Sequence, residues 1–194
     1  MASQPKVLHY IDLPLQHADD KILKAMNRHS TAEETREVIR KLRERMPDIA
    51  IRTTFIVGFP GEGDDEFETL AEFVNEEFER LGCFEYSPQE GTPAAKMENQ
   101  VDDDVKSRRA EVIMQDQYEI MTEKNNNMIG KTLRVLTESY DDYTDSYSGR
   151  SYMDAPDIDG KIIFTSPDFI KEGEFVDVEI LGVNEYDLLG RTVK

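Results

Sequence analysis

The sequence contains a single cysteine, Cys83, among its 194 residues. One cysteine excludes an internal disulfide framework and is typical of a protein that works in a reducing compartment. It also excludes a complete cysteine-ligated metal cluster built from this chain alone, because such clusters need several thiolates. Cys83 lies within an apolar segment, so we expect a buried strand residue there and no metal ligand in this chain.

Long apolar runs are missing too. No stretch approaches the roughly 20 apolar residues that a helix needs to cross a bilayer. The first residues, Met1 to Pro5, carry neither the basic region nor the apolar region of a secretory signal. With 38% hydrophobic and 33% charged residues, the composition indicates a globular protein of one large or two small domains. We therefore expect a cytoplasmic protein with no membrane partner.

Basic residues are scarce relative to acidic ones. The chain has 23 Lys and Arg against 41 Asp and Glu, for a formal net charge of −18. Such a surface repels phosphate backbones, because nucleic-acid binding depends on Lys and Arg. It attracts a basic protein partner, although acidity can also serve solubility alone. The charge therefore argues against nucleic acid as a partner.

The first hundred residues alternate apolar runs with amphipathic segments, which is typical of βα units in a parallel sheet. A capping box, Thr31 to Glu34, starts one of the helices, and Pro47 stops it. Pro14 should end the first strand, because it cannot donate to a ladder. Three strands cannot close a barrel, so the sheet is expected to be part of a larger one. Strands are predicted over 7–15, 49–58 and 82–87. A short helix is predicted after residue 20, and longer helices are predicted over 31–46 and 64–80.

The strand predicted over 49–58 runs into the turn Gly58-Phe59-Pro60-Gly61, directly before an acidic helix start. Ligands of α/β folds bind at the carboxyl ends of the strands. Glycine has no Cβ, so a bound molecule could lie against bare backbone at Gly58 and Gly61. A glycine turn is a weak signal by itself and equally fits an ordinary βα loop.

The alternation of apolar runs and amphipathic segments ends near residue 100. Residues 101–129 are expected to form a connecting helix with Gly130 as its C-cap. Its apolar face is predicted to consist of Val105, Val112, Ile113, Ile120 and Met121.

Residues 130–194 are expected to be a separate domain of five short strands. This pattern favours a small antiparallel barrel of the oligonucleotide-binding type. The segment 125–194 is nevertheless acidic, with a net charge of −7, which is the wrong sign for RNA. The predicted strands are 132–136, 147–152, 162–164, 175–181 and 188–193.

Three stretches in this order resemble a known family. They are Tyr10–Ala18 (YIDLPLQHA), Arg52–Glu62 (RTTFIVGFPGE) and Gly149–Gly160 (GRSYMDAPDIDG). Together they resemble the radical S-adenosylmethionine methylthiotransferases. The similarity is closest to the RimO-type enzymes, which modify an aspartate of a small-subunit ribosomal protein, and it covers essentially the whole chain.

The resemblance implies an overall fold and a set of cofactors. The family combines a partial barrel of six βα units with a TRAM domain, so residues 1–100 would be the carboxyl-terminal portion of the barrel and 130–194 the TRAM domain. The implied cofactors are S-adenosylmethionine and two [4Fe–4S] clusters in the full-length parent. The family's CxxxCxxC loop has no match here, so we expect the chain alone to be inactive and to contribute no catalytic residue.

The resemblance also implies sites, although core packing is an alternative for each cofactor residue. Arg52 begins the second strand, so it is expected at the end remote from the ligand, where its role could be structural; with the strand in the other direction it could pair with the methionyl carboxylate. Cofactor contacts are expected from Gln16, His17, Arg52, Ile56, Gly58, Phe59, Pro60, Gly61, Tyr86, Ser87 and Pro88. Docking of a basic small-subunit ribosomal protein is expected from Arg150, Asp154, Asp157 and Asp159.

Two other functions remain open. The parent could be the sister enzyme that methylthiolates an adenosine of tRNA, with Arg134, Arg150 and Lys161 contacting phosphates. The negative charge argues against that activity. The chain could also be a non-enzymatic acidic adaptor with a vestigial barrel.

Overall fold

The computed structural model describes residues 1–193, apart from the side chains of residues 76 and 77. Contacts divide the chain into two compact units. Residues 11–119 form an α/β unit, and the chain from residue 120 onward, with most of the first ten residues, forms the second. The division falls inside one continuous helix, so the connecting helix belongs partly to each unit.

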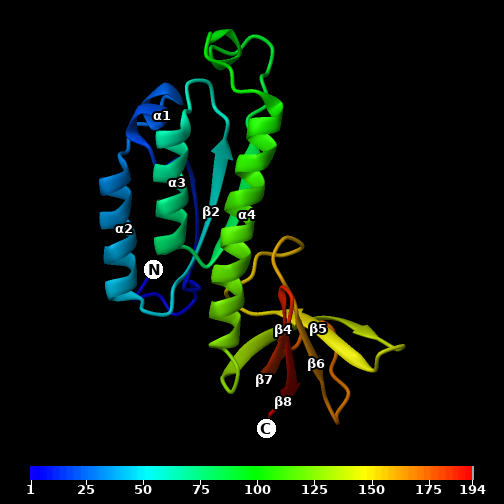
Figure 1. The fold of residues 1–194 in the computed structure, drawn as a ribbon. Helices are drawn as coiled ribbons and strands as arrows, with labels where there is room; N and C mark the ends of the chain where they lie inside the picture. The colour runs from blue at the N-terminus through cyan, green and yellow to red at the C-terminus, as the bar shows by residue number, and fades with distance from the viewer. Residues whose placement is uncertain (194) are drawn as a thin grey trace. The chain divides into compact units, whose positions relative to one another are not determined.

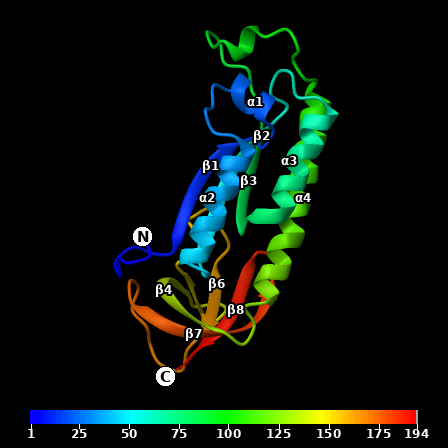
Figure 2. The same ribbon diagram turned by 90° about the vertical axis from the view of Figure 1, so that its left-hand side faces the viewer.

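The α/β unit holds a three-stranded sheet in the order β1-β2-β3 (Figures 1 and 2). β2 and β3 are parallel, with Arg52 opposite Arg80 and Val57 opposite Glu85. The prediction of parallel βα units is thus confirmed for this pair. The elements of this part of the chain are β1 (Tyr10–Gln16), α1 (Asp20–Ala25), α2 (Ala32–Arg45), β2 (Ala50–Val57), α3 (Asp64–Glu77), β3 (Arg80–Glu85), a 3-10 turn (Ala94–Lys96) and α4 (Asp103–Asn126).

The two faces of the sheet differ in burial. Along β2, every second side chain from Ile51 to Val57 is fully buried, because successive residues of a strand point to opposite faces. Phe55 on this face packs edge-on against Phe73 of α3 and against Phe78. The intervening residues Arg52, Thr54 and Ile56 are only half-buried. The face with Ile51 and Phe55 is therefore the core, and the other face is only partly covered.

Element boundaries corrected several expectations. β1 begins at Tyr10 and not at residue 7, and Pro14 lies inside it. β1 is the edge of this sheet, where a residue without an N–H is tolerated. The capping box is confirmed, since Thr31 and Glu34 bond each other's backbone N–H groups. β3 starts at Arg80, which was predicted to be helical, and ends at Glu85. Tyr86 therefore follows the strand and does not end it.

Helix α4 buries a different face from the one predicted. Ile113 and Met121 are buried, but Val112 is 41% exposed. The buried stripe also contains polar and charged residues at helical spacing: Lys106, Arg109, Gln117 and Asn125. Gly130 adopts the left-handed conformation (φ +84°) that was expected of a cap, but it lies four residues beyond the helix end at Asn126.

The second unit contains a closed barrel with strand order β4-β5-β6-β8-β7. The expected five-stranded barrel is confirmed, but β6 and β8 are parallel, so the barrel is mixed where an antiparallel one was expected. A cluster that includes Val135, Phe164, Val178 and Ile180 fills the interior. The strands are β4 (Thr132–Asp141), β5 (Ser146–Arg150), β6 (Ile162–Thr165), β7 (Phe175–Asn184) and β8 (Asp187–Thr192).

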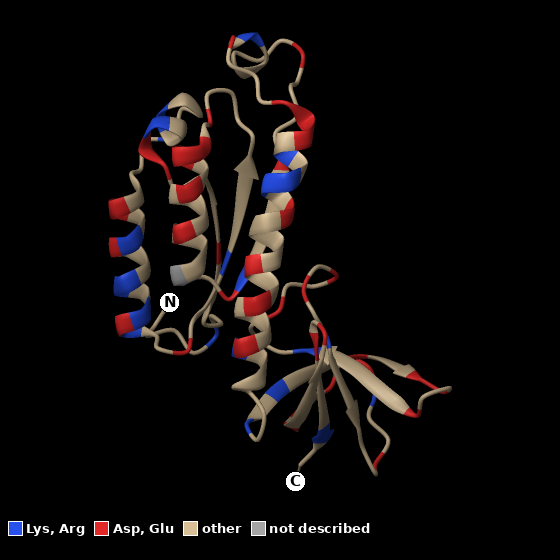
Figure 3. Ribbon diagram, viewed as in Figure 1, with Lys and Arg blue, Asp and Glu red and all other residues tan. Residues whose placement is uncertain are grey.

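Charged side chains are distributed unevenly over these elements (Figure 3). Helix α2 carries both signs, with intrahelical ion pairs such as Arg40–Glu37 at 2.8 Å. The first turn of α3 is entirely acidic, formed by Asp64, Asp65 and Glu66, which complements the helix dipole. Within residues 1–193, no helix is both long and apolar enough to cross a membrane.

Candidate cofactor-binding site

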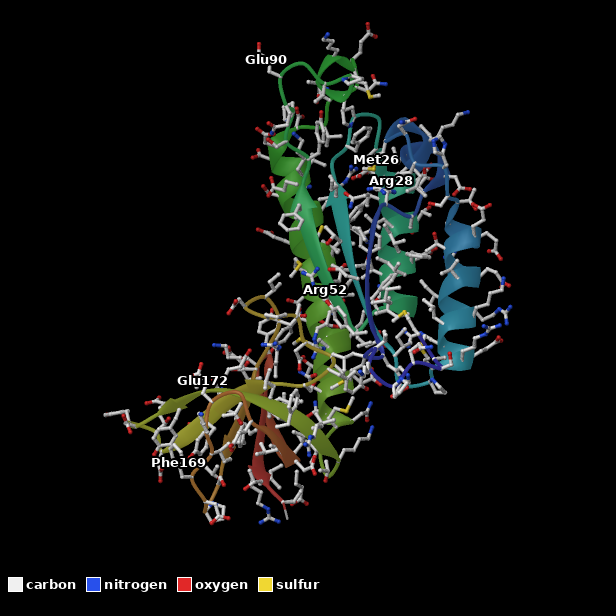
Figure 4. The ribbon with its side chains drawn as sticks, turned by 180° about the vertical axis from the view of Figure 1, so that it is seen from behind. Met26, Arg28, Arg52, Glu90, Phe169 and Glu172 are labelled. Carbon is white, nitrogen blue, oxygen red and sulfur yellow. The ribbon has the colours of Figure 1, made fainter. Side chains whose placement is uncertain are left out.

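A cavity of about 450 Å³ opens at the carboxyl ends of β1 and β2. This volume lies within the range of small-molecule pockets, which is roughly 300 to 1,000 Å³. Met26 and Arg28 lie at this end of the sheet, and Arg52 lies farther back along β2 (Figure 4). The lining residues are Gln16, Ala25, Met26, Asn27, Arg28, Ile56, Phe59, Tyr86, Thr92, Pro93, Ala94 and Met97.

Two aromatic rings shape one side of the cavity. Phe59 and Tyr86 meet edge-on, with ring centroids 5.2 Å apart. The backbone N–H of Tyr86 donates to the carbonyl of Val57 at 2.8 Å, which extends the β2–β3 pairing by one residue. Among residues 1–193, the buried Tyr86 hydroxyl has no hydrogen-bond partner. Such an orphaned hydroxyl next to apolar walls fits a ligand that combines an aromatic face with polar edges.

Four predicted cofactor residues line this cavity: Gln16, Ile56, Phe59 and Tyr86. Gln16 is the last residue of β1 and adopts a positive φ of 76°, which turns the chain out of the sheet. Ile56 points to the half-buried face of β2. The four come from three different elements, and the fold brings them together at one edge, as expected for the carboxyl ends of neighbouring strands. Their binding of a cofactor stays a prediction.

Glu62 lies at the centre of a polar network in which His17, Glu62 and Arg109 are buried and Asp64 is exposed. Its side chain has no exposed surface. One carboxylate oxygen accepts from the Gly58 N–H at 2.9 Å and from Arg109 Nη1 at 2.8 Å, and the other accepts from His17 at 3.1 Å. Arg109 Nη2 continues to Asp64 at 2.8 Å. We call His17, Glu62, Arg109 and Asp64 the Glu62 network.

His17 has a different place from the one predicted. It is 2% exposed, and both of its ring nitrogens are engaged within the protein. Nδ1 accepts the backbone N–H of Asp19 at 3.0 Å, so the ring proton resides on Nε2 and is donated to Glu62. His17 is therefore not placed to hydrogen-bond a ribose or methionyl group, and its role is to join two loops.

Gly58 also differs from expectation. Its φ of +72° explains the glycine, but its bare Cα does not face open space. An added Cβ would lie 2.2 Å from Lys106 Cγ. The aliphatic part of Lys106 occupies the room that was expected for a ligand, while its ammonium bonds Asp103 at 2.9 Å. Gly61 has φ +90° and no atom within 4 Å of the position of an added Cβ, so the backbone is open there instead.

The remaining predicted cofactor residues lie away from the cavity lining. Arg52 pairs with Asp12 of β1 at 3.0 Å, which favours the structural role over carboxylate binding. Pro60 is buried within its turn, and Ser87 and Pro88 are exposed in the loop after β3. The exposed loop reflects the earlier end of β3, at Glu85.

The predicted docking residues of the barrel unit divide into two groups. Asp154 is 8% exposed and accepts from the backbone N–H and the hydroxyl of Ser151 at 3.2 and 2.7 Å. Asp159 accepts from the Ala155 N–H at 2.8 Å. These two carboxylates shape the loop after β5, and their role as docking charges stays a prediction. Asp157 is exposed, and Arg150 is ion-paired with Glu138.

Cys83 lies in β3 and is half-buried. Burial, followed by the nearby carboxylates Glu62 and Glu85, raises the pKa of its thiol to about 12. A thiol that stays protonated at neutral pH is a poor metal ligand. Over the described residues, no group of three or more His, Cys, Asp or Glu side chains is arranged to hold a metal ion.

Arg109 and Lys106 are the site residues that sequence reasoning missed. Both are charged residues of a polar helix and read as solvent-facing. Their spacing of three residues places them on one helical face, but nothing in the local sequence marks that face as buried. Glu62 was missed for a related reason, because it follows the glycine turn and resembles another acidic residue of the helix start.

Comparison with known proteins covers both units. Residues 2–74 match the family model described as the radical SAM superfamily, and residues 129–193 match the TRAM domain. A protein of Acetivibrio thermocellus named ribosomal protein uS12 methylthiotransferase RimO is 46% identical over 194 residues. Proteins of the same name from Geobacter sulfurreducens and Bdellovibrio bacteriovorus are 45% and 44% identical over 193 and 190 residues.

These alignments cover 100%, 98% and 97% of this chain but 43%, 43% and 41% of the relatives. The chain thus spans less than half of the length of the relatives that it matches. With a radical SAM segment and a TRAM domain in the order and along the length shared with these relatives, the chain belongs to the radical SAM methylthiotransferase family.

Proposed function

We propose that the protein containing this chain methylthiolates the β-carbon of an aspartate in a small-subunit ribosomal protein by radical S-adenosylmethionine chemistry. The observation that carries the proposal is the sequence identity of 46%, along both units, to a relative named ribosomal protein uS12 methylthiotransferase. The negative charge of the chain supports a basic protein as substrate over tRNA.

The residues of the cavity suit the adenosine part of S-adenosylmethionine. Ile56 and Phe59 offer apolar walls for a base, and the Tyr86 hydroxyl and the Gln16 amide offer polar contacts. S-adenosylmethionine, together with iron–sulfur clusters held elsewhere in the full-length protein, supplies the radical and methyl chemistry. This chain's part is to bind, to orient and to keep water from the nucleoside.

We further propose that one end of the barrel docks the basic substrate. Gly173 N–H donates to the Thr137 carbonyl at 2.9 Å and Ile170 N–H to the Tyr147 hydroxyl at 3.2 Å, so the loop 166–174 meets the β4–β5 hairpin at these two residues. These two segments present Tyr143, which is 97% exposed, and Phe169 (Figure 4), which is 86% exposed.

Six carboxylates belong to the same two segments: Asp141, Asp142, Asp145, Asp168, Glu172 and Glu174. We call Tyr143, Phe169 and these carboxylates the acidic–aromatic end. Its charge complements a Lys- and Arg-rich segment, and its rings offer faces for cation–π contacts.

The activity is tested in the full-length protein. A bacterial strain lacking the modification is complemented with the full-length gene, and the ribosomal protein is examined by mass spectrometry. A methylthio group on one aspartate is expected. Modification of tRNA with an unmodified ribosomal protein would instead establish the sister activity.

Docking is tested with this chain by titrating purified small-subunit ribosomal protein at low and physiological salt. Phe169→Ser is expected to weaken binding about tenfold, in the range of an interface hot spot. Leu181→Ser, at another exposed apolar position of the barrel, is the matched control. Equal loss in both variants, or tight and salt-sensitive binding of tRNA, would contradict the docking proposal.

A further inference from the structure

We propose that Arg109 of helix α4 is a positioning residue for the cofactor cavity and that it acts through Glu62. The inference rests on the proposed function, in that the cavity is taken to hold the nucleoside of S-adenosylmethionine. Arg109 does not line the cavity. Its influence passes through hydrogen bonds that fix the loops from which the lining residues project.

The arrangement around Glu62 is fully satisfied. The carboxylate accepts from three donors, and Arg109 Nη1 also bonds the Glu62 backbone carbonyl at 3.1 Å. Arg109 therefore holds both the side chain and the backbone of Glu62. Its guanidinium also stacks over the Phe67 ring at 5.2 Å, which limits its movement. A planar fork held at this many points is a rigid anchor.

Two branches of the Glu62 network, through Gly58 and through His17, end next to a residue that lines the cavity. The Gly58 N–H that donates to Glu62 immediately precedes Phe59, and His17 immediately follows Gln16. The branch through His17 reaches the N–H of Asp19. The Asp19 carboxylate caps α1 through the Ile22 N–H at 3.0 Å.

Helix α1 leads in turn to Ala25 and Met26, which also line the cavity. Loss of Arg109 would leave the Glu62 carboxylate buried without its cation, and the carboxylate would reorient toward water. The loops that carry Gln16 and Phe59 would then lose a shared anchor. Misplacement of binding groups by about 1 Å can cost up to about a hundredfold in function.

The probe is S-adenosylhomocysteine, which has the nucleoside of the cofactor but needs no cluster chemistry. Its dissociation constant is measured by equilibrium dialysis with this chain and with Arg109→Met, Arg109→Lys and Arg108→Met. Arg108 is the neighbouring exposed arginine and serves as the matched control. Amide hydrogen exchange at Gly58 and Asp19 is followed in the same variants without ligand.

Arg109→Met is expected to weaken binding by at least about tenfold and to accelerate amide exchange at Gly58 and Asp19. Arg109→Lys restores a charge but not the fork, so it should recover part of both losses. Arg108→Met should behave as the unchanged chain. Wild-type affinity together with wild-type exchange in Arg109→Met would overturn the proposal.

Two further outcomes remain decisive. If the unchanged chain does not bind the probe, the assigned nucleoside site fails in this chain, but amide exchange still tests whether Arg109 holds the loops. If Arg109→Met does not fold, Glu62→Gln replaces it. The glutamine oxygen can still accept from Gly58, but its NH₂ group faces the Nε2–H of His17, so exchange should rise at Asp19 more than at Gly58. Unchanged exchange at Asp19 would overturn the network as a positioning device.

Discussion

Replacement of Gly58 by alanine tests the packing of the turn at the carboxyl end of β2. The added methyl group would lie 2.2 Å from Lys106 Cγ and 3.1 Å from Lys106 Cβ. The backbone would also be held at φ +72°, where an L-residue loses about 1 to 2 kcal/mol. Overpacking of a filled site adds about 1 to 3 kcal/mol. Gly58→Ala should therefore destabilise the α/β unit by about 2 to 5 kcal/mol.

Gly61→Ala is the matched control. Gly61 has a comparable φ of +90°, but nothing lies within 4 Å of the position of its Cβ. Both substitutions carry the cost of positive φ and the same gain from a less flexible unfolded chain. The difference between them isolates the contact with Lys106, which should be about 1 to 3 kcal/mol.

The assay is urea unfolding followed by far-UV circular dichroism, because the long helices of the chain begin in the α/β unit. A double variant, Gly58→Ala with Lys106→Ala, removes Cγ and should bring the cost down toward that of Gly61→Ala. Equal destabilisation by Gly58→Ala and Gly61→Ala would refute the close packing of Lys106 on the turn. Tighter binding of a nucleoside by Lys106→Ala would show that the bare Cα can be reached by a ligand.

Three further changes have expected outcomes. Thr31→Ala removes one half of the capping box of α2 and should lower the free energy of unfolding by about 1 kcal/mol in the same urea titration, and no change would contradict the cap. Phe164→Ala empties a site in the barrel core that is 1% exposed, where it stacks on Tyr147, and should cost about 3 to 5 kcal/mol, measured by loss of the barrel's thermal transition. Alkylation of Cys83 by iodoacetamide should be slow at pH 8 in the folded chain and fast in urea, because burial raises the pKa of the thiol to about 12. The contribution of the raised thiol pKa to the stability of the fold is fully present below pH 9.0 and is lost as the pH rises toward 12. Equal alkylation rates in the folded and unfolded chain would contradict the raised pKa.

The sequence by itself determined the local structure of this protein. Alternating burial along β2 follows from its β-branched and aromatic run, and Thr31 with Glu34 formed the expected capping box. Five β-rich runs formed five strands. These features depend on side-chain periodicity and on backbone preferences within a few residues, so they can be read from neighbouring letters.

Relations between distant segments were decided by the tertiary structure. Lys106 and Arg109 of helix α4 are buried because they contact Gly58 and Glu62. These partners are more than 40 residues away in the sequence, so no local pattern marks the two side chains as buried. The parallel pairing of β6 with β8 depends on how the barrel closes, which strand lengths do not fix.

Candidate ligand residues illustrate the same limit. The sequence placed Gln16 and His17 together at the end of β1, but only Gln16 lines the cavity. His17 points the other way because Glu62 and the Asp19 N–H satisfy both of its ring nitrogens in the interior. Gln16 ends β1 with a positive φ of 76°, so which of the two side chains meets a ligand depends on what packs against each of them. Glu62, 45 residues away in the sequence, is one of the two partners that offset the desolvation of the buried His17 ring, so the position of this ring is decided by the assembled fold.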